Sequence, residues 1–143
     1  MDLDRLVEEL VRDEGERLRV YKDSLGIETI GVGRNLRDKG ITKAESRFLL
    51  DNDIDECVAD LGNVPWFARL PESTQRGLLN MRFNLGPSRF WRWQTTLGYF
   101  ARGDVQGGAQ QFRTNRKYKA QIGDRFERIA RLLEGVESSR RTP

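Results

Sequence analysis

Apolar residues recur at helical spacing at the start of the chain. Five of them follow an i, i+3, i+4, i+7, i+8 pattern: Leu3, Leu6, Val7, Leu10 and Val11. This spacing is typical of an amphipathic helix with one buried stripe. Gly15 follows, and glycine commonly ends a helix. We therefore expect a first helix that starts at Leu3 and ends before Gly15.

The pattern changes between residues 18 and 33. Two short β-favouring pieces, "LRVY" and "ETIGVG", flank "KDSLG", which is a run of turn formers. Short β-favouring pieces on either side of a turn predict a small β-hairpin or ribbon. The strands are therefore expected to be segregated near the N-terminus.

Helical patterns return after residue 41. Thr42 and Glu45 have the Ser/Thr-x-x-Glu spacing in which each side chain bonds a free backbone amide at a helix start. They introduce the longest predicted helix, over about residues 42–61. "NVPWFARLP" is predicted to be a packed connector because prolines interrupt it.

The second half is predicted to be almost entirely helical. A buried helix begins near Ser73 and stops at Gly86-Pro87, and further helical runs cover "FWRWQTTLGYFARGD" and residues 104–112 and 124–133. Asp124 and Glu127 are interpreted as the capping pair of the last run. In "RFWRWQ", the spacing of Phe90 and Trp93 favours packing into one core face over a surface for stacking bases.

These patterns predict an α+β fold that is mostly helical, with a small β-hairpin lobe at the N-terminus and a helical C-terminal lobe. We expect a single domain over residues 1–143. Its parts are a first helix and β lobe over about 1–41, a connecting helix over about 42–61, a helical lobe over about 62–136, and a polar, disordered tail over 137–143. A cleft between the lobes is the expected site.

Composition narrows the chemistry. The chain of 143 residues has 37% hydrophobic and 33% charged residues, and no apolar run approaches the roughly 20 residues that cross a bilayer. It contains no histidine and one cysteine, Cys57. An internal disulfide is excluded, and a metal hydrolase or a Ser-His-Asp enzyme is not expected. We predict no metal and no cofactor. The acidic, periodic N-terminus does not have the pattern of a signal peptide.

Charge is distributed unevenly along the chain. Residues 1–60 carry 10 basic and 16 acidic side chains, whereas residues 61–143 carry 15 and 6. Such asymmetry fits two lobes that attract each other, a polyanionic substrate, or nucleic acid. The densest basic stretch contains Arg113, Arg116, Lys117 and Lys119, and it is either a solvated face or a surface that guides an anionic substrate.

Two acids flank the first β piece. Glu14 lies where the first helix ends, and Asp23 lies in the turn-forming run, so both are placed to line an opening. Hydrolysis of a glycosidic bond needs one carboxylic acid to protonate the departing oxygen and one carboxylate to activate water. The alternative is that Glu14 is a surface acid of the last helical turn and Asp23 a turn residue that bonds its own backbone.

The residues around these acids resemble a known family. Asp13-Glu14-Gly15, Leu18, Tyr21-Lys22-Asp23, Gly26 and "TIGVG" at 29–33 are similar to the active-site segment of phage lysozymes of glycoside hydrolase family 24, the T-even phage type. The similarity continues more weakly through "ITKAESRFLLDNDI", "LLNMRFNLG" and "DRFERIARLLEG". It covers nearly the whole chain.

The resemblance implies a role for particular residues. Glu14 matches the general acid of the family, Asp23 its second catalytic carboxylate, and Thr29 the hydroxyl that positions the attacking water. Asn84 matches a polar residue that faces substrate, and Arg125 an arginine that approaches the catalytic glutamate. Gly31 and Gly33 would leave one strand face bare for a close neighbour, and we assign Gly31 to contact with the sugar chain.

The implied activity is that of a muramidase, an endolysin-like enzyme for bacterial lysis. It would cleave the β-1,4 bond between N-acetylmuramic acid and N-acetylglucosamine in peptidoglycan with inversion at the anomeric carbon. We expect a monomer, with no nucleic acid partner, made in the host cytoplasm. It would reach the wall through a holin-type pore or on a virion.

The sequence also departs from the family pattern. Arg34 stands where the best-known members have histidine, so a His-Asp ion pair cannot form there. The segment from Arg34 to Thr42 is short, and Lys117-Tyr118 replaces a Trp-Tyr pair, a volume that Trp91 and Trp93 are expected to fill. These departures leave a wall-binding or virion structural module as an alternative function. A nucleic-acid-binding protein is a further alternative, based on charge and "RFWRWQ" alone.

Overall fold

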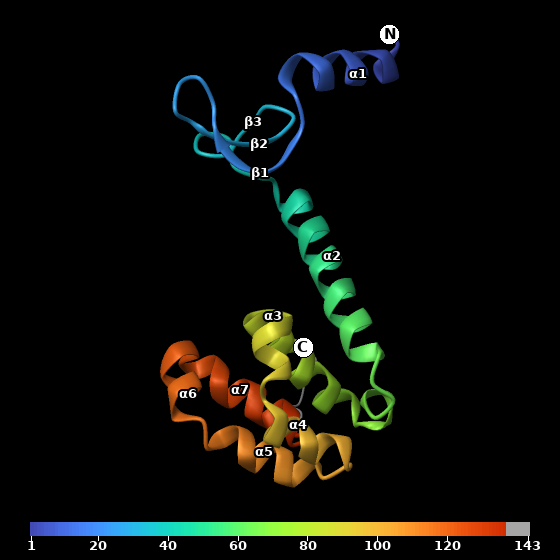
Figure 1. Ribbon diagram of the computed structural model, residues 1–143, viewed down its shortest axis with the longest axis vertical. Helices are drawn as coiled ribbons and strands as arrows, with labels where there is room; N and C mark the ends of the chain where they lie inside the picture. Colours follow the sequence, from blue (N-terminus) through green and yellow to red (C-terminus); the bar gives the residue numbers. More distant parts are fainter. Residues whose placement is uncertain (137–143) are drawn as a thin grey trace, which may run out of the picture. The chain divides into compact units, whose positions relative to one another are not determined.

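The computed structural model describes residues 1–136, and the predicted tail at 137–143 lies outside the described residues. The chain divides into two compact units, Met1–Leu49 and Leu50–Pro143. The described residues are mostly helical with one small antiparallel sheet, so the predicted α+β class is confirmed (Figure 1). No helix among residues 1–136 is both long and apolar enough to cross a bilayer.

The first unit starts with helix α1, Leu3–Glu14, as predicted. The Asp2 carboxylate accepts a hydrogen bond from the Arg5 amide at 3.0 Å and caps its start, and Gly15 ends it with a φ of 75°. The prediction of a buried stripe was wrong, because α1 has no buried residue and its stripe residue Val7 is 57% exposed. Helical spacing identifies an apolar face but does not say whether the face is covered.

Three strands follow in the order β1-β2-β3. Strand β1 is Arg17–Lys22, β2 is Glu28–Gly31, and β3 is Arg34–Asn35. The hairpin of β1 and β2 was predicted, and β3 was not, since a two-residue strand carries no alternating pattern. Because β2 lies between two partners, Thr29 at its centre pairs with Tyr21 on one side and Asn35 on the other.

Helix α2, Lys43–Gly62, begins at the predicted capping box. The Thr42 hydroxyl accepts from the Glu45 amide, and the Glu45 carboxylate accepts from the Thr42 amide, both at 3.1 Å. The division between the two units falls inside this helix. Of its apolar residues, Cys57 and Leu61 are buried, whereas Phe48 is 69% exposed.

The second unit continues with a short 3-10 helix and five α-helices, shown from green to red in Figure 1. Their bounds are η1 Phe67–Arg69, α3 Glu72–Trp91, α4 Gln94–Ala101, α5 Val105–Arg113, α6 Arg116–Ile122 and α7 Asp124–Leu133. The predicted stop at Gly86-Pro87 is a kink in α3, because Gly86 has a non-helical φ of 77° and ψ of 167°. The helix then continues to Trp91.

An aromatic cluster forms the centre of the second unit. The Phe112 ring stacks on Phe126 at 4.5 Å between centroids and on Trp93 at 5.8 Å, and Trp93 meets Tyr118 edge-on at 5.1 Å. Phe90 is fully buried, so the predicted core role of "RFWRWQ" is confirmed. Trp93 thus packs beside Tyr118, and the filling of the replaced Trp-Tyr volume by Trp91 and Trp93 stays a prediction.

Helices α2 and α3 are joined by a buried polar contact within the second unit. The guanidinium of Arg82, a residue that is 5% exposed, donates from Nε to the Asp60 carboxylate at 2.6 Å. The Trp91 indole donates to the same Asp60 oxygen at 3.0 Å. One aspartate oxygen therefore accepts hydrogen bonds from two side chains near the core.

Candidate functional site

Glu14 is the last residue of α1, and its position follows from how that helix ends. The Gly15 amide donates to the Val11 carbonyl at 2.8 Å, which closes the helix one residue beyond Glu14. The Glu14 side chain is exposed, and its carboxylate accepts no hydrogen bond from any residue in 1–136. Both of its oxygens are therefore free to meet a ligand.

Asp23 follows β1 and organises the turn between β1 and β2. Its Oδ1 accepts hydrogen bonds from the amides of Leu25 at 2.8 Å and Ile27 at 2.9 Å, and its own amide donates to the Ile27 carbonyl at 3.0 Å. The turn role that the sequence left open is therefore present. It occupies one carboxylate oxygen, and Oδ2 accepts no hydrogen bond from residues 1–136.

Thr29 is tied to the same turn through Ile27. Its hydroxyl donates to the Ile27 carbonyl at 2.8 Å, and the residue is 4% exposed. Because that bond uses the only hydroxyl proton, the oxygen can act toward any further group only as an acceptor. The Ile27 peptide groups thus link Asp23 to Thr29, and both side chains are held by the backbone of one turn.

Gly31 is the last residue of β2, and Gly33 lies in the loop that joins β2 to β3; their φ values are 65° and 63°. Left-handed backbone favours glycine, which is one reason for both residues. The close neighbour expected at these glycines is found at Gly33 only: a Cβ built there would lie 2.8 Å from Glu14 Oε2. At Gly31 nothing lies within 4 Å of such an atom, and contact with a sugar stays a prediction.

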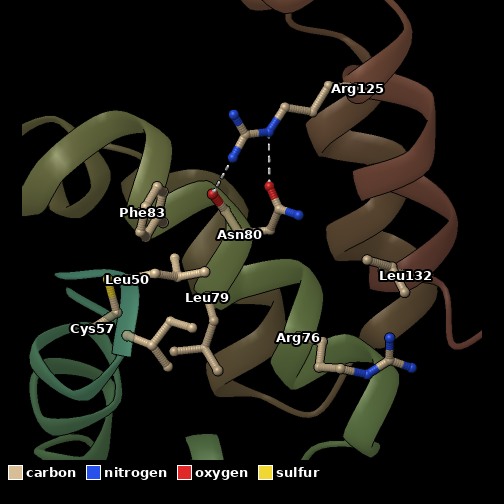
Figure 2. A pocket seen from close by; sticks show the side chains of 9 residues that line it. Leu50, Cys57, Arg76, Leu79, Asn80, Phe83, Arg125 and Leu132 are labelled. Atoms are coloured by element: carbon tan, nitrogen blue, oxygen red, sulfur yellow. Dashed lines mark hydrogen bonds between the residues drawn. The ribbon is translucent and has the colours of Figure 1, made fainter. Parts of the chain in front are cut away.

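Asn84 and Arg125 lie in the second unit. Asn84 Oδ1 accepts from the Tyr118 hydroxyl at 2.7 Å, which leaves the Asn84 amide nitrogen as a donor. Figure 2 shows Arg125 of α7 directed at Asn80 of α3, to which it donates from Nε at 2.9 Å. The structure therefore brings Glu14, Asp23, Thr29 and Gly31 into one compact unit, and the roles of Asn84 and Arg125 stay predictions.

An apolar pocket of about 390 Å³ lies beside Arg125 in the second unit (Figure 2). Its apolar lining comes from three helices: Leu50, Ile54 and Cys57 of α2, Leu79 and Phe83 of α3, and Leu132 of α7. Burial raises the pKa of the Cys57 thiol, which keeps it in the unreactive protonated form. No carboxylate among residues 1–136 lines this pocket.

The sequence did not identify the residues that hold the predicted site residues in place. Tyr118 binds Asn84 across 34 positions of the chain, and Asn80 binds Arg125 across 45. Burial raises the pKa of the Tyr118 hydroxyl, which therefore stays a hydrogen-bond donor at neutral pH. The one available signal was Asn80 itself, which precedes Asn84 by one helical turn.

Comparisons with known proteins identify the family of the chain. A sequence model of the phage lysozyme family matches residues 11–134. An endolysin of Salmonella phage P22 is 37% identical over 92 residues, which cover 57% of this chain and 60% of that protein. A SAR-endolysin of Bacteriophage PS119 is 31% identical over 105 residues, which cover 70% of this chain and 61% of that protein. The chain thus spans about three fifths of the length of the relatives it matches.

Proposed function

The chain belongs to the phage lysozyme family, and we propose on this basis that it is a muramidase that hydrolyses the β-1,4 bond between N-acetylmuramic acid and N-acetylglucosamine. One observation carries the proposal. Glu14, Asp23 and Thr29 belong to one compact unit; the Asp23 carboxylate accepts from the Ile27 amide, and the Thr29 hydroxyl donates to the Ile27 carbonyl. Peptidoglycan is the proposed substrate, and it is reached by holin-type release or on a virion.

In the proposed reaction, Glu14 donates a proton to the oxygen of the departing sugar while water attacks the anomeric carbon from the opposite face. The free Oδ2 of Asp23 takes the proton that this water loses. The same water donates its second hydrogen bond to the Thr29 oxygen. That oxygen can accept it because the hydroxyl proton is already donated to the Ile27 carbonyl. Inversion by this route requires the two carboxyl groups to lie about 6.5 to 9.5 Å apart.

The second candidate function is a wall-binding or virion structural module without turnover. Asp23 supports it, since two backbone amides already occupy its Oδ1 and give it a structural role in the turn. Such a module would bind peptidoglycan fragments and release no new reducing ends. The nucleic-acid alternative has less support, because Phe90 of "RFWRWQ" is buried and cannot stack on a base.

Substitution of Glu14 tests the proposal. Glu14→Gln keeps the size of the side chain and removes the acid, so the rate of peptidoglycan hydrolysis should fall about 10²- to 10⁴-fold. Glu16→Gln is the matched control, because Glu16 is an exposed carboxylate two residues away without a partner among residues 1–136. It should retain wild-type activity, and both variants should unfold at the wild-type urea concentration. Activity of Glu14→Gln within threefold of Glu16→Gln would contradict the proposal.

A further inference from the structure

The loop between β2 and β3 approaches the proposed proton donor at one atom. A Cβ added at Gly33 would lie 2.8 Å from Oε2, 3.1 Å from Cδ and 3.4 Å from Cγ of Glu14. Real Cβ atoms do not approach other heavy atoms to 2.8 Å, so an alanine at this position and the present Glu14 conformation exclude each other. We infer that Gly33 is a positioning residue for Glu14: its bare Cα leaves the space that the acid occupies.

This inference rests on the proposed function for its consequence in catalysis, and on geometry alone for the contact. The loop itself has little freedom to move away from Glu14. Ile30 pairs with Arg34 across the loop, and the Leu36 amide donates to the Glu28 carbonyl at 2.8 Å. Arg34 also binds the Gly40 carbonyl at 3.2 Å and Glu45 at 2.8 Å. Both ends of the loop are therefore anchored within the first unit.

Glu14 is the partner that would move. Its side chain is exposed, and its carboxylate accepts no hydrogen bond from residues 1–136, so no such bond has to break for it to rotate. The clash of an added methyl group at Gly33 would thus be relieved when the Glu14 carboxyl moves away, at little cost to the stability of the fold. A displaced acid lies outside hydrogen-bond reach of the departing oxygen, and a misplacement of about 1 Å lowers a rate about 10²-fold.

The chain provides a control for the backbone effect. Alanine at Gly33 is strained by the positive φ of 63° as well as by Glu14. Gly40 has nearly the same φ of 64° in the same unit, and a Cβ there would make only an ordinary contact, 3.9 Å from the Leu36 carbonyl oxygen. Gly40→Ala therefore reproduces the backbone strain without the collision.

The experiment compares Gly33→Ala with Gly40→Ala in the full chain. Both should lower the urea midpoint to a similar extent. On soluble peptidoglycan fragments, Gly33→Ala should lower kcat about 100-fold with KM within twofold of wild type, because the acid acts in the transition state and not in binding. Gly40→Ala should keep kcat within threefold. Equal kcat in the two variants would overturn the inference.

A readout without activity separates this inference from the proposed function. In wild type, NMR should show a nuclear Overhauser contact between the Gly33 α-protons and the Glu14 γ-protons, and Gly33→Ala should shift the Glu14 carboxyl carbon resonance whereas Gly40→Ala should not. Absence of the contact in wild type overturns the inference even if Gly33→Ala fails to fold. If the contact is present and Glu14→Gln is fully active, the positioning of Glu14 stands and the proposed function fails.

Discussion

At the scale of single residues, Arg34 forms an ion pair at a position where the sequence excludes a His-Asp pair. It stands where the best-known members of the family have histidine, and it binds Glu45 at the start of α2. It also donates to the Gly40 carbonyl, so one guanidinium connects β3, the following loop and a helix start. The chain has no histidine here to pair with an aspartate, and Arg34 pairs with Glu45 within the first unit.

The protonation of Glu45 makes this interaction dependent on pH. Hydrogen bonds from Arg34, and then from the Thr42 amide, lower the pKa of the Glu45 carboxyl from 4.5 to about 2. Because the folded-state pKa is the lower one, the Glu45 contribution to stability is complete above about pH 4.5 and is lost as the pH falls toward 2. The free energy of unfolding of wild type should therefore exceed that of Glu45→Gln at pH 6 and approach it near pH 2. A difference that is constant between pH 6 and pH 2 would contradict this assignment.

The candidate site residues were identifiable from the sequence because their spacing is local. Glu14, Asp23 and Thr29 lie within 16 consecutive residues, and the turn formers around Asp23 predicted the bonds that its Oδ1 accepts. Contacts between distant segments gave no such signal. The approach of Gly33 to Glu14 depends on how the β2-β3 loop folds back toward α1, and a sequence pattern does not encode that distance.

Helices were predicted correctly where the sequence has a regular apolar stripe or a capping motif. Helix α6, Arg116–Ile122, was not predicted, because it is short and charged and buries only Tyr118. The proposed capping pair of α7 was wrong. Gly123 is the N-cap there, Asp124 already lies within the helix, and Glu127 binds Arg113 of α5 instead. A carboxylate three residues into a helix can serve either a cap or a neighbouring helix, and spacing does not distinguish the two.

The close packing of α3 on α7 predicts the effect of a small substitution. A Cβ at Gly77 of α3 would lie 2.9 Å from Cδ2 and 3.1 Å from the backbone nitrogen of Leu133, which is fully buried and cannot move aside. Overpacking a core costs about 1 to 3 kcal/mol, which exceeds the roughly 0.5 to 1 kcal/mol that alanine gains over glycine in a helix. Gly77→Ala should therefore destabilise the protein in urea unfolding.

Gly62 at the end of α2 is the control for that prediction. A Cβ there would have no neighbour within 4 Å, so Gly62→Ala makes a similar helical substitution without overpacking. Its free energy of unfolding should equal or exceed the wild-type value. If the two variants changed stability by the same amount, the packing of Gly77 against Leu133 would not be the cause.

At the scale of the whole molecule, the fold class and the family were predicted correctly from the sequence. The packing of each part was predicted less well. The sheet lies in the first unit, and the aromatic core lies in the second. Of the predicted basic stretch, Arg113 is neutralised by ion pairs with Glu127 and Glu134, so its charge is less available to guide a substrate than sequence counting implied. The three residues of the proposed acid chemistry, Glu14, Asp23 and Thr29, all lie in the first unit.

The most direct measurement of the central claim is proton NMR of the sugars released from purified peptidoglycan by the full chain. Inverting hydrolysis by two carboxyl groups predicts new N-acetylmuramic acid reducing ends that appear first in the α configuration and then equilibrate. Reducing ends that appear first as the β anomer would contradict the roles of Asp23 and Thr29 in aligning water. Release of no new reducing ends would contradict the enzymatic account altogether.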